Sequence, residues 1–378
     1  MKISDDIVWQ AEPLTTGAIA AIEQDWHDLL ANSIEKNIYM APWFVRASIA
    51  LFPGPTPQLI TIYSGNLLIG VLLVESDFGY AKMPVWFLRN TLHKHQFLGT
   101  PLVREAYVKE FASGLLQWLD ASRSRHQFIL FTQMTGDSDI TDALNTVSAA
   151  QNRSIVEFDR FDRAKISADK NHGAQTQSHL STSRKKGLKR RRLALTQHGE
   201  IAFEKLRDAA DLEAWISDFL RLENLGWKHD KGTSIEENAD DEALYRRLLP
   251  DAFDANALNF FRLTVGGKPI AYTLDFACGT YVYCHRCAFD VDYKKYAPGV
   301  LMEVETQNYY GQNSFIKHID SCTAPDNQLL NELWPDRKSI VTIGIVKNHF
   351  SARLIFKMVR YIKGLLKNPA EARGFASK

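Results

Sequence analysis

One segment, Tyr281 to Met302, joins a strand-like run, an acidic and aromatic turn, and Pro-Gly opening an apolar helix. The first N–H groups of a helix have no partner within it, and the helix dipole adds partial positive charge there. Such a point binds phosphate without a basic side chain. Pro298 loses nothing at a first-turn site, and Gly299 lets a ligand approach the backbone closely. The predicted pyrophosphate-binding residues are Tyr296, Ala297, Pro298, Gly299 and Val300.

A plain helix start gives the same pattern, so a second signal is needed. Two upstream blocks supply it: Ser183 to Gly199 reads SRKKGLKRRRLALTQHG, and Phe219 to Ile235 reads FLRLENLGWKHDKGTSI. With the turn DVDYKKYAPG, these blocks resemble in order and spacing the CelD-like acetyltransferases of the GNAT superfamily, a group related to the Fem-type aminoacyl transferases. The resemblance covers roughly residues 180 to 345, and extends more faintly to NIYMAPWF (Asn37–Phe44) and HQFLGTPLV (His95–Val103). It implies an acyltransferase that uses acetyl-CoA or another acyl-CoA as co-substrate, with no metal.

Composition limits the classes of protein that fit. A chain of 378 residues suits two domains rather than one core. With 45% hydrophobic and 24% charged residues, the whole chain is expected to fold. The net charge is only +1, so affinity for nucleic acid or an acidic membrane has to come from local clusters. The N-terminus does not resemble a secretory signal, and the longest apolar run, Leu67–Val74, is too short to span a membrane. A cytoplasmic protein with reduced cysteines is predicted.

The periodicities predict an α/β fold of mixed type, with two GNAT-like lobes that each hold a mixed, mostly antiparallel sheet flanked by helices. In the first, a hairpin joins Leu59–Tyr63 to Leu67–Glu75, with a helix at Val108–Leu119 and a strand at Gln127–Thr132. The second begins with a basic helix, and its expected strands are Glu200–Leu206, Leu258–Val265, Pro269–Cys278, Tyr281–Phe289, Phe315–Cys322 and Ile340–Val346. The predicted boundaries are 1–165 for a degenerate lobe serving as scaffold or acceptor platform, 166–346 for the acyltransferase lobe, and 347–378 for a basic amphipathic helix and tail. The linker is expected at Asp169–Gln177.

The candidate catalytic residues are Glu223, His285 and Asp320. Strict alternation along Tyr281–Phe289 places His285 with Cys287 on one face and Arg286 on the other. His285 suits general-base work at neutral pH, and a packed core histidine is the alternative. Glu223 is the carboxylate of the family motif and precedes a loop that the resemblance places beside the acceptor cleft. Asp275 and Asp320 are acids within apolar strands and need partners, and a turn cap is the alternative for Asp320.

The candidate substrate-binding residues are Trp227, Lys228, Asp275, Arg184 and Arg191. Seven of the nine residues from Arg184 to Arg192 are basic. A solvated face is the ordinary interpretation of such a run. The alternatives are a site for an acceptor phosphate, a nucleotide sugar, a lipid head group or transfer RNA, and the sequence does not separate them. No aromatic interleaving or helix-turn-helix pattern accompanies the run, so a sequence-reading nucleic-acid binder is not favoured.

Two further patterns bear on metal and membrane binding. Cys284 and Cys287 would face opposite sides of a regular strand, and no second Cys-x-x-Cys follows, so no metal site is predicted. Phe350 to Leu366 forms a basic amphipathic helix, with its apolar stripe at Leu354, Ile355, Met358, Tyr361, Ile362 and Leu365. The helix either packs on the second lobe or rests on anionic lipid at the inner face of the membrane. We expect packing on the second lobe, with the basic side exposed.

The resemblance thus implies transfer of an acyl group to the amino or hydroxyl group of a sugar, a nucleotide sugar, or a polysaccharide or lipid-linked precursor, as in polysaccharide biosynthesis. Glu223 or His285 would be the base. One rival is Fem-like transfer of an aminoacyl group from transfer RNA, in which Arg184 to Arg192 would hold the RNA. Another is a degenerate, non-enzymatic scaffold or membrane adaptor.

Overall fold

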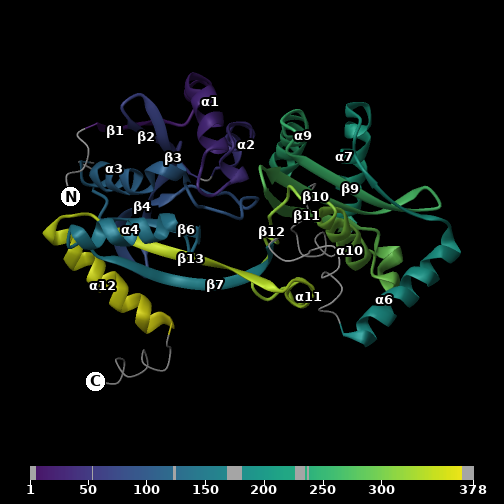
Figure 1. Ribbon diagram of the computed structural model, residues 1–378. Helices are drawn as coiled ribbons and strands as arrows, with labels where there is room; N and C mark the ends of the chain where they lie inside the picture. Colours follow the sequence, from purple (N-terminus) through teal and green to yellow (C-terminus); the bar gives the residue numbers. More distant parts are fainter. Residues whose placement is uncertain are drawn as a thin grey trace. The chain divides into compact units, whose positions relative to one another are not determined.

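The computed structural model describes residues 6–52, 54–121, 125–167, 181–225, 235 and 238–367. The chain divides into two compact units (Figure 1): unit 1 comprises Met1–Asp162 and Ser339–Lys378, and unit 2 comprises Arg163–Lys338. Each unit is a mixed sheet flanked by helices, which confirms the predicted α/β class.

Unit 1 is built on a sheet whose strand order is β1-β2-β3-β4-β6-β13. The strands are β1 (Ile7–Pro13), β2 (Gln58–Ser64), β3 (Leu67–Tyr80), β4 (Met83–Asn90), β5 (Leu102–Val103), β6 (Phe128–Thr135), β7 (Ile155–Ser167) and β13 (Asp336–Val346). The helices are α1 (Thr16–Ala31), α2 (Pro42–Ser48), α3 (Val108–Ala121), α4 (Asp139–Ala150) and α12 (Phe350–Lys367). The expected hairpin is β2–β3, and its turn places Gly65 at φ +56°, a left-handed conformation that glycine adopts without strain.

Alternation along β6 explains how helices cover both faces of this sheet. Ile129 and Phe131 join the core beneath α3 and α4, whereas Phe128 and Leu130 face α12. Successive side chains of a strand point to opposite faces, so one apolar run serves two cores. Figure 1 shows α12, in yellow, on the other side of the sheet from α3.

Unit 2 has the strand order β8-β9-β10-β11-β12, and β12 pairs in turn with the last residues of β7. Its strands are β8 (Ile201–Lys205), β9 (Leu258–Val265), β10 (Lys268–Cys278), β11 (Tyr281–Phe289) and β12 (His318–Asp320). Its helices are α6 (Thr182–Leu195), α7 (Ala209–Asn224), α9 (Ala239–Asp254), the 3-10 helix η5 (Val291–Tyr296), α10 (Pro298–Gly311) and α11 (Gln328–Leu333). The apolar face predicted for α7 is buried, from Leu212 through Trp215 and Phe219 to Leu222.

The two units repeat one order of elements. Each has a strand, two helices, three antiparallel strands, a helix, a strand parallel to the third, and another helix. In unit 1 the parallel pair is β4 and β6, and in unit 2 it is β11 and β12. No sequence repeat accompanies this order, so the duplication is visible only in the structure.

The C-terminal boundary differs from the prediction. The expected strand Ile340–Val346 does form, as part of β13, but it pairs antiparallel with β6 and places Val341, Ile343 and Ile345 in the core of unit 1. The following α12 packs on unit 1 and not on the second lobe. The last strand and helix return to the first unit because their partners lie some 200 residues away, beyond the range of any local pattern. The predicted linker, Asp169–Gln177, lies outside the described residues.

In the described ranges, no helix is both long enough and apolar enough to cross a membrane.

Candidate functional site

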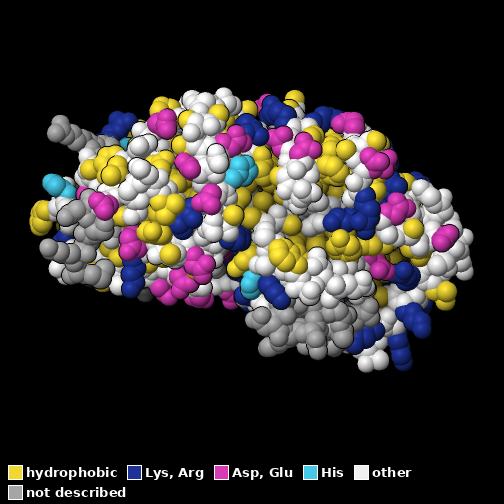
Figure 2. Space-filling view, turned by 45° about the horizontal axis from the view of Figure 1, so that its top comes forward, with side chains coloured by type: hydrophobic (Ala, Val, Ile, Leu, Met, Phe, Trp, Pro, Cys, Tyr) yellow, Lys and Arg dark blue, Asp and Glu magenta, His cyan; other side chains and the backbone are white. Residues whose placement is uncertain are grey.

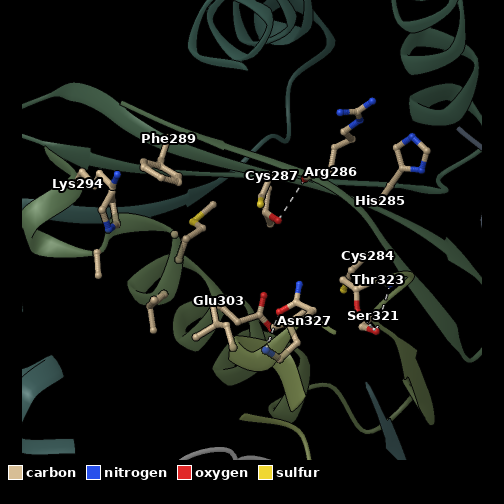
Figure 3. A pocket seen from close by; sticks show the side chains of 18 residues that line it. Cys284, His285, Arg286, Cys287, Phe289, Lys294, Glu303, Ser321, Thr323 and Asn327 are labelled. Atoms are coloured by element: carbon tan, nitrogen blue, oxygen red, sulfur yellow. Dashed lines mark hydrogen bonds between the residues drawn. The ribbon is translucent and has the colours of Figure 1, made fainter. Parts of the chain in front are cut away.

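A pocket opens in unit 2 where two parallel strands separate. β11 and β12 pair Tyr281–Tyr283 with His318–Asp320, and the pairing ends there. The pocket, about 360 Å³ in volume, lies beyond this point between β11, the start of α10 and α11 (Figure 3). Its lining comprises Thr273, Cys284, His285, Arg286, Cys287, Phe289, Lys294, Ala297, Pro298, Gly299, Val300, Met302, Glu303, Ser321, Thr323, Asn327, Leu329 and Leu330.

A β-bulge in β11 decides which side chains face this pocket. Leu274 pairs with Arg286 and Asp275 with Cys284, so His285 is an extra residue in β11. The bulge turns His285 and Arg286 to the same side, where both contact Tyr245 of α9. Cys284 and Cys287 both line the pocket on the other side (Figure 3). The sequence predicted that Arg286 faces away from His285 and that Cys284 faces away from Cys287. Both predictions were wrong, because the bulge places the members of each pair on the same side.

The thiols nevertheless form no recognisable metal centre. Over the residues that the structure describes, no group of three His, Cys, Asp or Glu side chains is arranged to hold a metal ion. Burial raises the pKa of the Cys284 thiol well above its usual range, so Cys284 holds its proton at neutral pH.

The start of α10 borders one end of the pocket, and Ala297, Pro298, Gly299 and Val300, the residues predicted to bind pyrophosphate, line it there. Ala297 has φ +54°, a left-handed conformation, and no side chain caps the helix. In the first turn of α10, Pro298 has no N–H and the Val300 N–H donates to the Ala297 carbonyl at 3.0 Å, which leaves the Gly299 amide to face a ligand. Gly299 has no left-handed φ, and an added Cβ would lie 3.5 Å from the Phe289 ring. The absence of a side chain at Gly299 therefore keeps the space between α10 and Phe289 open.

Tyr296 stands apart from the other predicted cofactor residues. It does not line the pocket. Its hydroxyl lies 2.6 Å from Nε2 of His198, and this contact holds η5 against the turn before β8. The neighbouring Lys294 does line the pocket and adds a positive charge to it (Figure 3).

Three polar residues of the pocket, Glu303, Ser321 and Thr323, were not predicted from the sequence. Glu303 lies on the second turn of α10, and its Oε1 accepts from Nε2 of Gln307 at 2.7 Å and from Nε1 of Trp334 at 3.0 Å. Burial raises the pKa of Glu303, and these two donors only partly offset it. The hydroxyls of Ser321 and Thr323 lie 3.0 Å apart in the loop after β12. A carboxylate within the apolar run after Pro298 was the one available signal.

A second polar cluster lies on the opposite side of β11 from Cys287. The hydroxyl of Tyr245 is 2.9 Å from Nε2 of His285 and accepts from Nε of Arg286 at 3.2 Å. Nη1 of Arg286 donates to Oε1 of Glu223 at 2.8 Å, and the Ile235 N–H donates to Oε2 at 2.8 Å. Burial raises the pKa of Tyr245 to about 12, so the phenol keeps its proton at neutral pH. Glu223 and His285 thus belong to one cluster, joined by Tyr245 and Arg286, which the sequence did not single out.

Asp320, the third predicted catalytic residue, is held by two cations. Nη2 of Arg163 donates to Oδ2 at 2.7 Å, Lys338 lies 3.1 Å from the same oxygen, and the Cys322 N–H donates to Oδ1 at 3.0 Å. Burial acts to raise its pKa, but Arg163 and Lys338 outweigh burial and hold the pKa well below its usual range. A carboxylate held in this way is a poor proton acceptor at neutral pH. Asp320 therefore secures β12 to β7, and the catalytic prediction is corrected.

The predicted substrate residues are scattered. Asp275 is fully buried behind the pocket and does not line it, and its Oδ2 accepts from the Tyr310 hydroxyl at 2.8 Å. Burial raises its pKa to about 8. Arg184 forms an ion pair with Glu332 of α11, and Arg191 is exposed on α6. Trp227 and Lys228 lie outside the described residues.

The basic helix α6 docks through Leu188 and Leu195, which contact the core of unit 2. Ion pairs join Arg184 to Glu332 of α11 and Arg192 to Glu305 of α10, the two helices that border the pocket. Figure 2 shows the remaining lysine and arginine side chains of this end of unit 2 projecting into solvent.

In unit 1 the gap that corresponds to the pocket is closed by the chain itself. β4 and β6 pair through Leu88 and Arg89 and then separate. Nδ2 of Asn90 donates to the carbonyls of Gly99 at 3.1 Å and Thr132 at 2.9 Å, and Oδ1 accepts from the Thr132 N–H at 2.8 Å. The buried Asn90 side chain thus bridges β4 and β6 at the position where β11 and β12 of unit 2 leave an open gap. Unit 2 is therefore the unit with a ligand-sized gap at this position.

Comparison with known families also points to unit 2 as the functional unit. Residues 182–327 match the model described as the acetyltransferase (GNAT) domain. Most of unit 2 is therefore similar to a GNAT domain. The match runs from α6 to the residue before α11 and includes most of the pocket, and it supports a transferase of the GNAT acyltransferase superfamily.

Solved structures share the fold over most of the chain. One is a conserved protein of unknown function from Bacteroides thetaiotaomicron (14% identity, TM-score 0.56, covering 90% of this chain and 100% of that one). Another is the C-terminal domain of a putative lysylphosphatidylglycerol synthetase from Agrobacterium fabrum (12% identity, TM-score 0.54, covering 90% and 95%). A third is FemX (9% identity, TM-score 0.59, covering 93% and 100%). At these identities the likeness concerns the fold alone. No curated protein matches the chain.

Proposed function

We propose that the protein is an acyl-CoA-dependent N- or O-acyltransferase whose donor binds in the pocket of unit 2. The observation that carries the proposal is the open gap between β11 and β12, with the uncapped start of α10 at one end. An extended thioester arm fits a narrow, largely apolar gap, and phosphates fit the exposed amides of a helix start. The bound donor would supply an activated acyl group.

Different residues of the pocket would contact different parts of such a donor. The amide of Gly299, the dipole of α10 and the charge of Lys294 suit the pyrophosphate. Phe289, Met302 and Leu330 provide apolar walls for the arm. Glu303 and Asn327 offer hydrogen bonds to the amide groups of the arm. No basic side chain is required along the arm itself.

The Tyr245–His285 pair, next to the gap, is the proposed proton-transfer group. His285 would accept the proton of the attacking amine or hydroxyl as the bond to the acyl carbon forms. The bond from that carbon to sulfur then breaks, and the sulfur takes up a proton. Tyr245 holds its own proton and orients the imidazole, while Glu223 fixes Arg286 behind Tyr245. In this scheme His285 is the base, and Glu223 is a positioning residue.

The resemblance to the CelD-like group supports a sugar, nucleotide sugar, or polysaccharide or lipid-linked precursor as acceptor. Trp227 and Lys228 remain candidates for holding it, by the same resemblance. The buried Asp275 does not reach the pocket and is withdrawn from that role.

Calorimetry of the intact protein with free CoA, acetyl-CoA and longer acyl-CoAs tests the donor. We expect saturable binding that weakens by about tenfold or more in Gly299→Val, because branched methyl groups would enter the space beside Phe289. Gly17→Val is the matched control: Gly17 is also the second residue of a helix, and its added Cβ would meet nothing closer than 3.8 Å. Binding that is absent, or equal in the intact protein and Gly299→Val, contradicts the proposal.

A second candidate donor is an aminoacyl-transfer RNA, which the surface of α6 favours. Lys185, Lys186, Lys189, Arg190 and Arg191 lie on that helix beside the two arginines already paired. A dense row of cations binds a phosphate backbone in a salt-dependent way. Mobility-shift assays with transfer RNA separate the candidates. Salt-dependent binding that is lost in Lys189→Glu/Arg190→Glu, together with no CoA binding, favours RNA, and no binding of either ligand favours a scaffold.

A further inference from the structure

The C-terminal helix α12 has two apolar faces. One is buried: Ala352, Phe356 and Val359 pack against Phe87, Phe128 and Phe158 of the unit 1 sheet. The other carries four large side chains in solvent, with exposed fractions of 83% for Phe350, 55% for Leu354, 48% for Met358 and 58% for Tyr361. Packing on the sheet explains the buried apolar face, but it does not explain the exposed one.

The four exposed residues form a continuous stripe along the helix. Their spacings of four, four and three residues keep them on one side of an α-helix. Residues 356 and 359 lie about half a turn away from this stripe, so it points directly away from the sheet. Figure 1 shows α12 on the side of the unit 1 sheet that faces away from α3. Packing on unit 1 therefore leaves the four side chains of the stripe exposed.

Charge along α12 has a single sign. The helix contains Arg353, Lys357, Arg360, Lys363 and Lys367, and no acidic residue. Lys363 is bound on the inner side, where its Nζ lies 2.8 Å from Asp159 and 2.9 Å from the Tyr80 hydroxyl. Lys357 and Arg360 are exposed and flank the stripe. A chain with a net charge of only +1 thus concentrates cations beside its densest row of exposed apolar side chains.

We propose that the outer face of α12 is a docking surface for an anionic lipid bilayer. Apolar side chains on one side, cations at the flank and an aromatic residue at each end of the stripe are the features of helices that lie in a membrane interface. An apolar stripe of this length on a water-soluble surface calls for a partner. An anionic lipid surface matches both the apolar stripe and the cations beside it. The stripe would insert among the acyl chains, and the anionic head groups would attract Lys357 and Arg360.

The packed inner face makes this surface pre-formed. Many interfacial helices order only on contact with lipid and pay conformational entropy for it. Here Phe356 and Val359 hold the helix on the sheet before contact. The proposal is independent of the donor and acceptor of the transfer reaction.

Co-sedimentation of the full chain with vesicles tests the proposal. The probes are vesicles of phosphatidylcholine with about one third phosphatidylglycerol, and vesicles of phosphatidylcholine alone. We expect binding to the anionic vesicles that weakens as salt is raised from 50 mM to 500 mM. Leu354→Gln/Met358→Gln/Tyr361→Gln should weaken it by about tenfold or more, and Lys357→Gln/Arg360→Gln by a similar factor at low salt. These side chains are exposed, so both variants should keep the melting temperature of the intact protein.

The matched control is Val8→Gln/Leu67→Gln, which removes two exposed apolar side chains elsewhere in unit 1 and should bind vesicles as the intact protein does. Intact protein that stays in the supernatant with anionic vesicles overturns the proposal. So does equal binding by the stripe variant. If light scattering shows a dimer that the stripe variant converts to a monomer, and vesicle binding is absent, the face is a contact between two copies of the chain, and the lipid assignment is wrong.

Discussion

The pH dependence of stability at Asp275 offers the sharpest test of the buried chemistry behind the pocket. Asp275 is fully buried on β10 and accepts hydrogen bonds from the Tyr310 hydroxyl at 2.8 Å, from the Cys284 thiol and from the His285 backbone. Burial raises its pKa to about 8, and nearby Glu303 adds to the effect. In the unfolded chain an aspartate ionises near pH ~3.9. Between these two values the folded protein holds a proton that the unfolded chain has lost.

The sign of the effect follows directly. The stabilising contribution of protonated Asp275 is fully present below pH ~4 and is lost as the pH rises through about 8. Each pH unit within this window costs about 1.4 kcal/mol of folding free energy. Asp275→Asn keeps the volume and an oxygen to accept from Tyr310, and it has no charge to bury. From pH 5 to pH 8 the stability of the variant relative to the intact protein should therefore rise by up to about 4 kcal/mol.

Urea unfolding at pH 5, 6, 7 and 8, followed by tryptophan fluorescence, measures this difference. Near the midpoint of thermal unfolding, 4 kcal/mol corresponds to roughly 8–16 °C for a unit of this size. The exposed Asp254→Asn is the control, because it has no burial cost to relieve. A difference between Asp275→Asn and the intact protein that stays constant to within about 0.5 kcal/mol across the four pH values would refute the reasoning, since Asp275 would then ionise as it does in water.

Three other changes probe the roles assigned to acids and bases. Once an acceptor is known, His285→Gln should lower kcat by roughly two to four decades with CoA affinity retained, and unchanged turnover removes His285 as base. Glu223→Gln should cost only about tenfold in kcat and leave the pH profile of kcat in place, because Glu223 acts through Arg286; loss of the basic limb would instead make Glu223 the base. Asp320→Asn leaves the cations of Arg163 and Lys338 buried, so urea unfolding at pH 7 should show a loss of about 3–5 kcal/mol, and a loss below 1 kcal/mol would contradict the anchoring role.

Local patterns predicted most elements of the fold. The period of α7, the hairpin of β2 and β3, the glycine turns of the β9–β11 meander and the Pro-Gly start of α10 were all predicted from residues close together in the chain. Each depends on neighbours a few positions away, which is the range over which propensity and periodicity act. The turn predicted to bind phosphate belongs to this class, and four of its five predicted residues line the pocket.

The tertiary structure decided the features that depend on distant partners. β13 joins unit 1 because it pairs with β6, and α12 follows it there. The bulge at His285 arises from the register between β10 and β11, and it reverses the faces of Arg286 and Cys287. The sequence indicates that Asp320 needs a partner but does not identify one, and the folded chain brings Arg163 and Lys338 to it. Register, pairing and charge compensation are set by the contacts of the whole fold, and a run of neighbouring residues does not contain them.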